Sequence, residues 1–484
     1  MGFKIALFNI ADFNKKSRFS SLGLGYLASY LRRYSQFNQI HIIEGDGFNK
    51  LRQIKPDLIG IYSVTQKFNE VVSLTQVLKS HFPGVPVIVG GHHITALPDT
   101  LPECFDVAVL GEGEKTMHEL TQVIADGRLN LDSLAKIPGL AFRHDGRVMI
   151  TAQRDFIHDI DSVPFPARDL MVNIPFSSIM TSRGCPYSCA FCASVSYWRK
   201  PRFHSPEYVV DEMHEIITKY HAVHISIWDD LFISDKRRLE AICGLILKKG
   251  INRKVSFACA LRSNLIDKHV CGLLKSMNVK RVSFGFETGS QKILDFLKCG
   301  SVTVEQHIKA VELCKAHGFH TTGTFMLGSP GETQEDMLAT LDLVKKLKLD
   351  GGGTFSVAVP FPGTQFWEIA KGKGLVSDRM DYSRIGIMSA DFTKPEDFKG
   401  ILLTDKISKE RFFEIARNIQ KVSNRYYIRG LLRLRNLSLK NIKYVFARPG
   451  EVLAILKFIV GSFLHRSSEM DRYIYYYQKA GAKK

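Results

Sequence analysis

The sequence has few cysteines and no long hydrophobic run. Nine cysteines in 484 residues are too few for a disulfide scaffold, so we expect reduced thiols and a cytoplasmic location. The apolar run at residues 452–463 contains Lys457 and is shorter than the ~20 residues that span a bilayer. Residues 1–10 lack the pattern of a secretory signal peptide. These shortages exclude a small secreted module and leave peripheral contact as the expected limit of any membrane association.

Positive charge is unevenly distributed along the chain. The sequence has 66 Lys and Arg against 48 Asp and Glu, and residues 411–484 carry 16 of the former and four of the latter. A basic segment raises nucleic acid or an anionic membrane as a partner. No RNA-binding module is apparent, so nucleic acid is not the expected partner.

The first 125 residues alternate short β-branched strands with amphipathic helices. Strands are expected at five segments, residues 4–10, 40–45, 58–63, 86–91 and 107–111. This alternation predicts a parallel sheet with helices on both faces. Because strand carboxyl ends form the ligand crevice of such sheets, we expect a cofactor-binding domain here. Glycines stand at those ends, namely Gly60, Gly90, Gly91 and Gly111.

A second series of strands follows a segment with Pro164 and Pro166, which indicate a linker. Six strands are expected, at residues 177–182, 224–230, 255–262, 281–287, 320–327 and 354–360. Six strand–helix units fall short of a closed eightfold barrel, which needs ~250 residues. We therefore expect an α/β protein with four regions: a Rossmann-like domain at 1–150, a linker at 151–177, a partial (β/α)6 TIM-like barrel at 178–375, and a basic, mainly helical region at 376–484.

Three closely spaced cysteines, Cys185, Cys189 and Cys192, follow the first barrel strand in a Cys-x3-Cys-x2-Cys pattern. Three thiolates on one loop can ligate three irons of a four-iron cluster and leave the fourth iron open. A zinc site or buried unpaired thiols are the alternatives, but structural zinc prefers four protein ligands in two pairs, and no second pair exists. The cysteines are therefore expected to be the metal ligands and the catalytic centre.

This cysteine run, with Phe191 before its last cysteine, resembles the motif of the radical S-adenosylmethionine (SAM) superfamily. The resemblance covers residues 178–365 and implies a [4Fe-4S] cluster and SAM as cofactors. In that family the open iron chelates the methionyl group of SAM. An electron from the cluster, itself supplied by a donor of flavodoxin or ferredoxin type, cleaves SAM to a 5′-deoxyadenosyl radical.

The resemblance implies roles for residues at later strand ends. Asp229 and Asp230 stand where relatives have a Gly-Gly-Glu segment that binds the SAM amino group, although two aspartates depart from that pattern. Arg262 is expected to pair with the SAM carboxylate, Glu287 to lie near the ribose, and the backbone around Phe191 to contact adenine. From the residues alone, the aspartates could instead cap a helix, Arg262 could form a surface ion pair, and Glu287 could face solvent.

The N-terminal block resembles the cobalamin-binding domain of one large radical SAM class. The resemblance is carried by residues 22–28, 57–63, 87–93 and 110–114. Small residues at strand ends let the corrin approach the backbone. No Asp-x-His-x-x-Gly loop follows the first strand, which implies cobalamin without a histidine ligand. The expected cofactor-binding residues are Gly60, Ser63, Gly90, Gly91, His92, Gly111 and Glu112.

The basic C-terminal region contains Arg425, Arg429, Arg433 and Arg435, followed by the apolar residues 452–463. An amphipathic helix of this kind can lie in a membrane interface, which would suit a lipid-like substrate. A solvated basic face packed over the barrel is the alternative.

The leading hypothesis is a cobalamin-binding radical SAM enzyme that methylates an unactivated carbon of a small-molecule or lipid-like substrate. The resemblance supplies the preference for methylation. One alternative is a cyclase or ring-rearrangement enzyme of a tetrapyrrole, lipid or natural-product pathway. A second is an RNA-modifying radical enzyme, and a third is a non-enzymatic iron–sulfur electron carrier.

Overall fold

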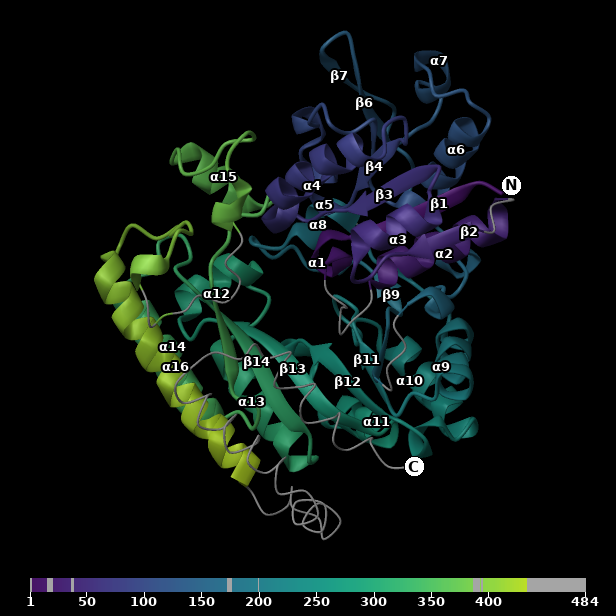
Figure 1. Cartoon of the computed structure of the whole chain (residues 1–484). Helices are drawn as coiled ribbons and strands as arrows, with labels where there is room; N and C mark the ends of the chain where they lie inside the picture. Colours follow the sequence, from purple (N-terminus) through teal and green to yellow (C-terminus); the bar gives the residue numbers. More distant parts are fainter. Residues whose placement is uncertain are drawn as a thin grey trace, which may run out of the picture. The chain divides into compact units, whose positions relative to one another are not determined.

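The computed structural model describes residues 2–14, 21–35, 39–171, 176–198, 200–385, 392 and 395–432 (Figure 1). The chain divides into two compact units. The first comprises Met1–Pro186, Phe191–Ala222 and Pro360–Gly386, and the second comprises Tyr187–Ala190, Val223–Val359 and Ile387–Lys484. The cysteine loop therefore contributes residues to both units.

A seven-stranded sheet forms the centre of the first unit, in the order β2-β1-β3-β4-β5-β6-β7. All five predicted strands are present and parallel: β1 (Lys4–Asn9), β2 (Gln39–Ile42), β3 (Leu58–Tyr62), β4 (Val87–Gly90) and β5 (Val107–Val109). Two further strands, β6 (Leu140–His144) and β7 (Arg147–Ile150), extend the sheet antiparallel. These two strands are not among those predicted from the sequence.

The helices of the first unit follow the predicted strand–helix alternation. They are α1 (Ile10–Phe13), α2 (Leu22–Tyr34), α3 (Gly47–Ile54), α4 (Phe68–His81), α5 (His92–Ala96), α6 (Gly113–Ala125), α7 (Leu131–Leu134), α8 (Ala193–Trp198), α9 (Pro206–Tyr220) and α15 (Gln365–Gly372). Strand residues Ile5 and Leu58 are fully buried together with Leu31 of α2 and Leu120 of α6. This apolar core holds the carboxyl ends of the strands, and the loops that follow them, in fixed positions.

Strands around the cysteine loop also belong to the first unit. β8 (Phe176–Ile179) lies at the first barrel strand predicted from the sequence, and β9 (Ser182–Arg183) pairs antiparallel with β10 (Arg202–Phe203). The β9–β10 pair fixes Arg183 two residues before the first cysteine of the loop.

The second unit contains the other five predicted barrel strands. They are β11 (His224–Ile227), β12 (Ser256–Leu261), β13 (Val279–Glu287), β14 (His320–Leu327) and β15 (Gly353–Val357), and each pairs in parallel with the next. The helices between them are α10 (Lys236–Lys248), α11 (Lys268–Ser276), α12 (Gln291–Lys298), α13 (Val304–Ala316) and α14 (Gln334–Leu347). This alternation is that of the predicted partial barrel.

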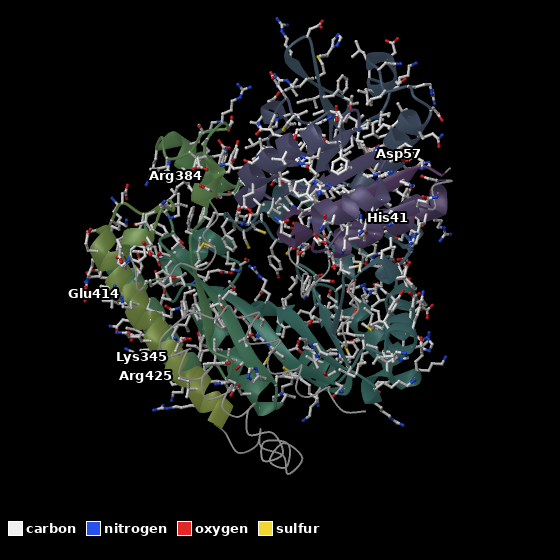
Figure 2. The ribbon with its side chains drawn as sticks, viewed as in Figure 1. His41, Asp57, Lys345, Arg384, Glu414 and Arg425 are labelled. Atoms are coloured by element: carbon white, nitrogen blue, oxygen red, sulfur yellow. The ribbon has the colours of Figure 1, made fainter. Side chains whose placement is uncertain are left out.

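The described part of the C-terminal region is helical, as predicted. Helix α16 (Lys409–Leu432) packs along α14 and touches β15, and Figure 2 labels Glu414 and Arg425 on it. The hydroxyl of Ser423 accepts a hydrogen bond from the amide of Gly353 at 2.7 Å. Arg433, Arg435 and residues 452–463 lie outside the described residues.

No helix among the described residues is long and apolar enough to cross a membrane.

Candidate active site

The three predicted metal ligands, Cys185, Cys189 and Cys192, are half-buried thiols that form no disulfide, in the loop between β9 and α8. Cys185 and Cys192 belong to the first unit and Cys189 to the second. Within the described ranges, no three His, Cys, Asp or Glu side chains converge on a point that could hold a single metal ion.

Cys189 contacts Arg262, which follows β12. The Nη1 atom of Arg262 donates to the Sγ atom of Cys189 at 3.6 Å, and the guanidinium lies 3.8 Å from the centre of the Tyr187 ring. Nη2 donates to the hydroxyl of Ser301. Arg262 is therefore a half-buried neighbour of the cysteine loop and uses both terminal nitrogens within its own unit.

Glu287 ends β13 in an unusual backbone conformation. Its φ is +63°, in the left-handed region, and the register of the β13–β14 pair shifts between Gly285 and Glu287. Its carboxylate accepts a hydrogen bond from Lys298 at 2.7 Å, and both side chains are buried. The alternative that Glu287 simply faces solvent is therefore wrong.

Asp229 and Asp230 follow β11 with opposite exposure. Asp229 is buried and Asp230 is exposed. Asp235, and neither of these two residues, caps α10 by accepting a hydrogen bond from the amide of Arg238, so the helix-cap alternative is wrong. Burial, with a smaller contribution from the charge of Asp229, raises the pKa of the Cys259 thiol to about 12.

The predicted cobalamin-binding residues Ser63, Gly90, Gly91, His92 and Gly111 lie at or just after the carboxyl ends of β3, β4 and β5. The expectation that Gly60 stands at a strand end is wrong, because Gly60 is the middle residue of β3 and a Cβ atom built on it would lie 2.6 Å from the Leu7 side chain. Gly91 has a φ of +109°, and a Cβ atom built on it would lie 2.4 Å from the carbonyl oxygen of Ser63. His92 shares a hydrogen bond of 3.0 Å with the Tyr62 hydroxyl, and its ring centroid lies 4.3 Å from that of Tyr197. The Tyr197 hydroxyl donates to the carbonyl of Gly111 at 2.8 Å. These contacts bring α8 against the strand ends.

Glu112 lies in a buried ion-pair network. Its two carboxylate oxygens accept from Arg183 at 2.5 Å and from Arg202 at 2.8 Å, and Arg183 also pairs with Glu114 at 2.6 Å. Burial alone would raise the pKa of Glu112, but the two arginines outweigh it and hold that pKa below its usual value. The network ties the loop after β5 to the strand that leads into the cysteine loop.

Sequence reasoning missed Arg183, Arg202 and Glu114 as residues that shape this site. The available signal was an arginine two residues before the first cysteine and two glutamates separated by one residue. Neither signal identifies its partner, because residues 112 and 183 are far apart in the sequence and meet only in the folded chain.

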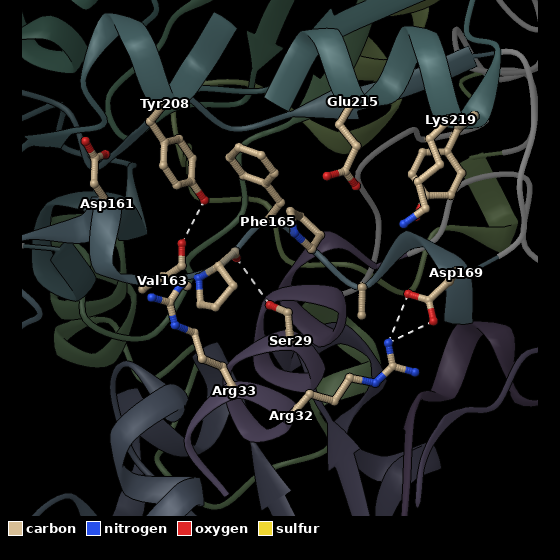
Figure 3. Close-up of a pocket in the computed structure, with 14 residues that line it drawn as sticks. Ser29, Arg32, Arg33, Asp161, Val163, Phe165, Asp169, Tyr208, Glu215 and Lys219 are labelled. Atoms are coloured by element: carbon tan, nitrogen blue, oxygen red, sulfur yellow. Dashed lines mark hydrogen bonds and ion pairs between the residues drawn. The ribbon is translucent and has the colours of Figure 1, made fainter. Parts of the chain in front are cut away.

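Phe191 lies 6.2 Å, centroid to centroid, from Phe366 of α15. A pocket of about 580 Å³ opens elsewhere in the first unit, and Figure 3 shows Arg33, Phe165, Tyr208 and Lys219 around it. None of the predicted site residues lines this pocket. Its charged residues include the ion pair between Arg32 and Asp169 at 2.8 Å, which closes one side.

Comparison with protein families identifies two domains in the chain. Residues 179–344 match the radical SAM superfamily, and residues 13–121 match the B12-binding domain. The second match covers β2–β5, and the first covers β11–β14 together with the three cysteines.

Individual relatives agree with this assignment. The chain is 34% identical to an uncharacterized methyltransferase of Pyrococcus horikoshii, over 73% of this chain and 79% of the relative. It is 26% identical to the anaerobic magnesium-protoporphyrin IX monomethyl ester cyclase of Rubrivivax gelatinosus, over 81% and 73% of the two chains. Its fold is similar to that of the radical SAM methyltransferase TsrM from Kitasatospora setae, with a TM-score of 0.63 and 20% identity over 77% of this chain and 75% of that one. The chain therefore belongs to the radical SAM enzymes that carry a B12-binding domain before the radical SAM domain.

Proposed function

We propose that this enzyme transfers a methyl group to an unactivated carbon, with a [4Fe-4S] cluster, SAM and cobalamin as cofactors. The observation that carries the proposal is the loop of three reduced, half-buried cysteines in a chain whose N-terminal domain is of the B12-binding family. When bound, the cluster and SAM supply a carbon-centred radical by hydrogen abstraction, and cobalamin supplies the methyl group.

The donor set of the cysteine loop fits a four-iron cluster. Cys185, Cys189 and Cys192 are half-buried and free of disulfides, and Arg262 brings a positive charge to one of the sulfurs. Thiolates are the ligands that iron–sulfur clusters prefer, and three of them leave one iron for SAM. The loop would therefore ligate three irons of the cluster and leave the fourth for SAM.

Residues at the strand ends would orient SAM. One of the two aspartates after β11, the buried Asp229 or the exposed Asp230, would accept hydrogen bonds from the ammonium group of the methionyl part. Glu287, held by Lys298, would lie near the ribose, and the backbone around Phe191 near the adenine.

The strand ends of the first unit would hold cobalamin. Gly111 leaves the backbone open to a flat macrocycle, because no atom lies within 4 Å of a Cβ atom built on it. Gly90 and Gly91 stand at the end of the neighbouring strand β4, whereas Gly60 lies inside β3, where Leu7 fills the space that a Cβ atom would take. The sequence after β1 has no Asp-x-His-x-x-Gly loop, which supports cobalamin without a histidine ligand to cobalt. Glu112 would support the pocket through Arg183 and Arg202, since both of its carboxylate oxygens are already paired.

The substrate would be a small or lipid-like molecule, and a flavodoxin or ferredoxin would supply the electron. A second candidate function is cyclisation, favoured by the similarity to a relative named as a magnesium-protoporphyrin IX monomethyl ester cyclase. Peripheral membrane contact through the basic C-terminal region remains part of the proposal.

Anaerobic reconstitution with iron, sulfide and cobalamin, followed by SAM and a reductant, tests the function. Formation of 5′-deoxyadenosine together with S-adenosylhomocysteine supports methylation, whereas 5′-deoxyadenosine alone supports cyclisation. Cys189→Ala should abolish formation of 5′-deoxyadenosine. Cys104→Ser is the matched control, because Cys104 is a half-buried thiol outside the motif whose pKa burial raises to about 11. A protein that binds zinc at the three cysteines, or that leaves SAM intact, would contradict the proposal.

A further inference from the structure

The middle of the cysteine loop, Tyr187–Ala190, is hydrogen-bonded to residues at the carboxyl end of α12. The amide of Ala190 donates to the carbonyl of Leu297 at 3.0 Å. The thiol of Cys299 donates to the carbonyl of Ser188 at 3.0 Å. These two contacts lie on either side of Cys189 and fix its backbone within the second unit.

Arg262 adds contacts from the end of β12. Its Nη1 donates to the sulfur of Cys189 at 3.6 Å, within hydrogen-bond range for sulfur, and its guanidinium stacks on the Tyr187 ring at 3.8 Å. Asn264 donates to the Tyr187 hydroxyl at 3.0 Å and fixes the ring on which the guanidinium lies. The other terminal nitrogen, Nη2, donates to Ser301. Each terminal nitrogen of the guanidinium therefore has one protein acceptor, whereas the buried Nε has none among the described residues.

The partner of Nη2 is itself fixed by a buried ion pair. The hydroxyl of Ser301 donates to the carbonyl of Lys298, and the ammonium of Lys298 donates to Glu287 at 2.7 Å. The side chains of Lys298 and Glu287 are each 8% exposed. A continuous series of contacts thus runs from the Cys189 sulfur through Arg262 to the end of β13, so the guanidinium has little freedom to leave the sulfur.

A guanidinium held on a thiolate changes what that thiolate does as an iron ligand. Hydrogen bonds to cluster sulfurs and nearby positive charge favour the reduced cluster, which carries one more negative charge. The partial burial of Arg262 and Cys189 strengthens this interaction, because it reduces screening by water. We propose that Arg262 is a positioning residue that raises the reduction potential of the cluster through Cys189, instead of pairing with the SAM carboxylate. The inference rests on the proposed function, since it requires the cluster.

Potentiometric titration of the reconstituted full-length protein without SAM, followed by the EPR signal of the reduced cluster, tests the proposal. In Arg262→Gln, we expect the ratio of reduced to oxidised cluster at a fixed reductant potential to fall about tenfold, equivalent to 59 mV for a one-electron couple. Arg262→Lys keeps the positive charge but not the planar guanidinium, so we expect the ratio of reduced to oxidised cluster to fall by less than in Arg262→Gln. Arg253→Gln is the control, because Arg253 is exposed and its loss changes the net charge equally.

A second measurement separates this role from SAM binding. The dissociation constant of SAM, taken from its perturbation of the cluster EPR signal, should change less than threefold in Arg262→Lys. An unchanged potential in both Arg262 variants, with SAM bound at least tenfold more weakly, would overturn the inference and restore Arg262 as the carboxylate partner. If Arg262→Gln retains no iron, the reduction potential of the cluster in Arg262→Lys tests the proposal instead, and a potential equal to that of wild type contradicts it. A wild-type protein that forms no redox-active cluster would instead overturn the proposed function.

Discussion

The ammonium of Lys298 donates to the carboxylate of Glu287 at 2.7 Å, and both side chains are buried. Glu287 has a φ of +63°, a conformation that non-glycine residues rarely adopt. A buried ion pair therefore stands at a strained strand end, beside the site that we propose for SAM.

Removal of one partner should destabilise the second unit. Lys298→Met would leave the carboxylate of Glu287 buried without its counter-charge, which typically costs about 3–5 kcal/mol. We expect a lower denaturant midpoint in anaerobic unfolding monitored by circular dichroism. The double variant Glu287→Gln, Lys298→Met removes both charges and should recover much of the loss. Equal midpoints for the single and double variants would show that the pair is not coupled.

The network around Glu112 should make the first unit sensitive to acid. Burial raises the pKa of Glu112, but Arg183 and Arg202 lower it further, so the folded pKa lies below the unfolded value of 4.5. A depressed carboxyl pKa contributes stability that is present above pH 4.5 and is lost as the pH falls through the folded pKa.

Glu112→Gln should be less stable than wild type at pH 7, and the difference should shrink as the pH falls below 4.5. Thermal unfolding at several pH values measures this. Asp132→Asn serves as the control, because it also removes one carboxylate, and Asp132 is exposed and lies outside the ion-pair network of Glu112. A difference from wild type that is the same at every pH would contradict the assignment.

The strands could be predicted from the sequence, whereas the contacts of the site could not. Segments such as residues 58–63 and 86–91 are short apolar runs bounded by turn residues, and this local pattern is enough to identify a strand. The partners of Arg262, Cys189 and Ser301, are far from it in the sequence and come close only in the folded chain, so no local pattern predicts them. The antiparallel strand β7 was missed because its residues are largely exposed and lack apolar alternation.

Glu332, in the loop after β14, should give the second unit the opposite dependence on pH. Its carboxyl accepts backbone hydrogen bonds from Gly328 at 2.5 Å and from Ser329 at 2.9 Å, and it is fully buried. Burial raises the pKa of Glu332 to about 8. The folded state therefore favours the protonated acid, whose stabilising effect is complete below pH 4.5 and is lost as the pH rises through about 8.

Glu332→Gln should keep the two backbone hydrogen bonds without the ionisation. We expect this variant to gain stability relative to wild type between pH 6 and pH 9, measured by denaturant unfolding. Glu332→Ala, which loses both acceptors, should be destabilised at every pH. The prediction fails if Glu332→Gln and wild type keep a constant difference across this range.

Gly91 should tolerate no side chain, because two separate constraints meet there. Its φ of +109° is strained for any residue with a Cβ atom, and that atom would lie 2.4 Å from the carbonyl oxygen of Ser63 and 2.9 Å from the Tyr62 ring. Gly84 isolates the first constraint, since it has a φ of +81° and no atom within 4 Å of a built Cβ. Gly84→Ala should therefore cost only the backbone strain, of order 1–3 kcal/mol.

Gly91→Ala should cost clearly more than Gly84→Ala in the thermal unfolding of the first unit, because the backbone of β3 must move to relieve the contact with Ser63. It should also weaken binding of added cobalamin, followed by the shift of its visible absorption, since Gly91 lies at the strand end that we propose as the corrin site. Gly84→Ala should leave cobalamin binding unchanged. Equal unfolding temperatures for the two variants would mean that the backbone at Ser63 moves at little energetic cost. A wild-type cobalamin affinity in Gly91→Ala would mean that the corrin binds elsewhere.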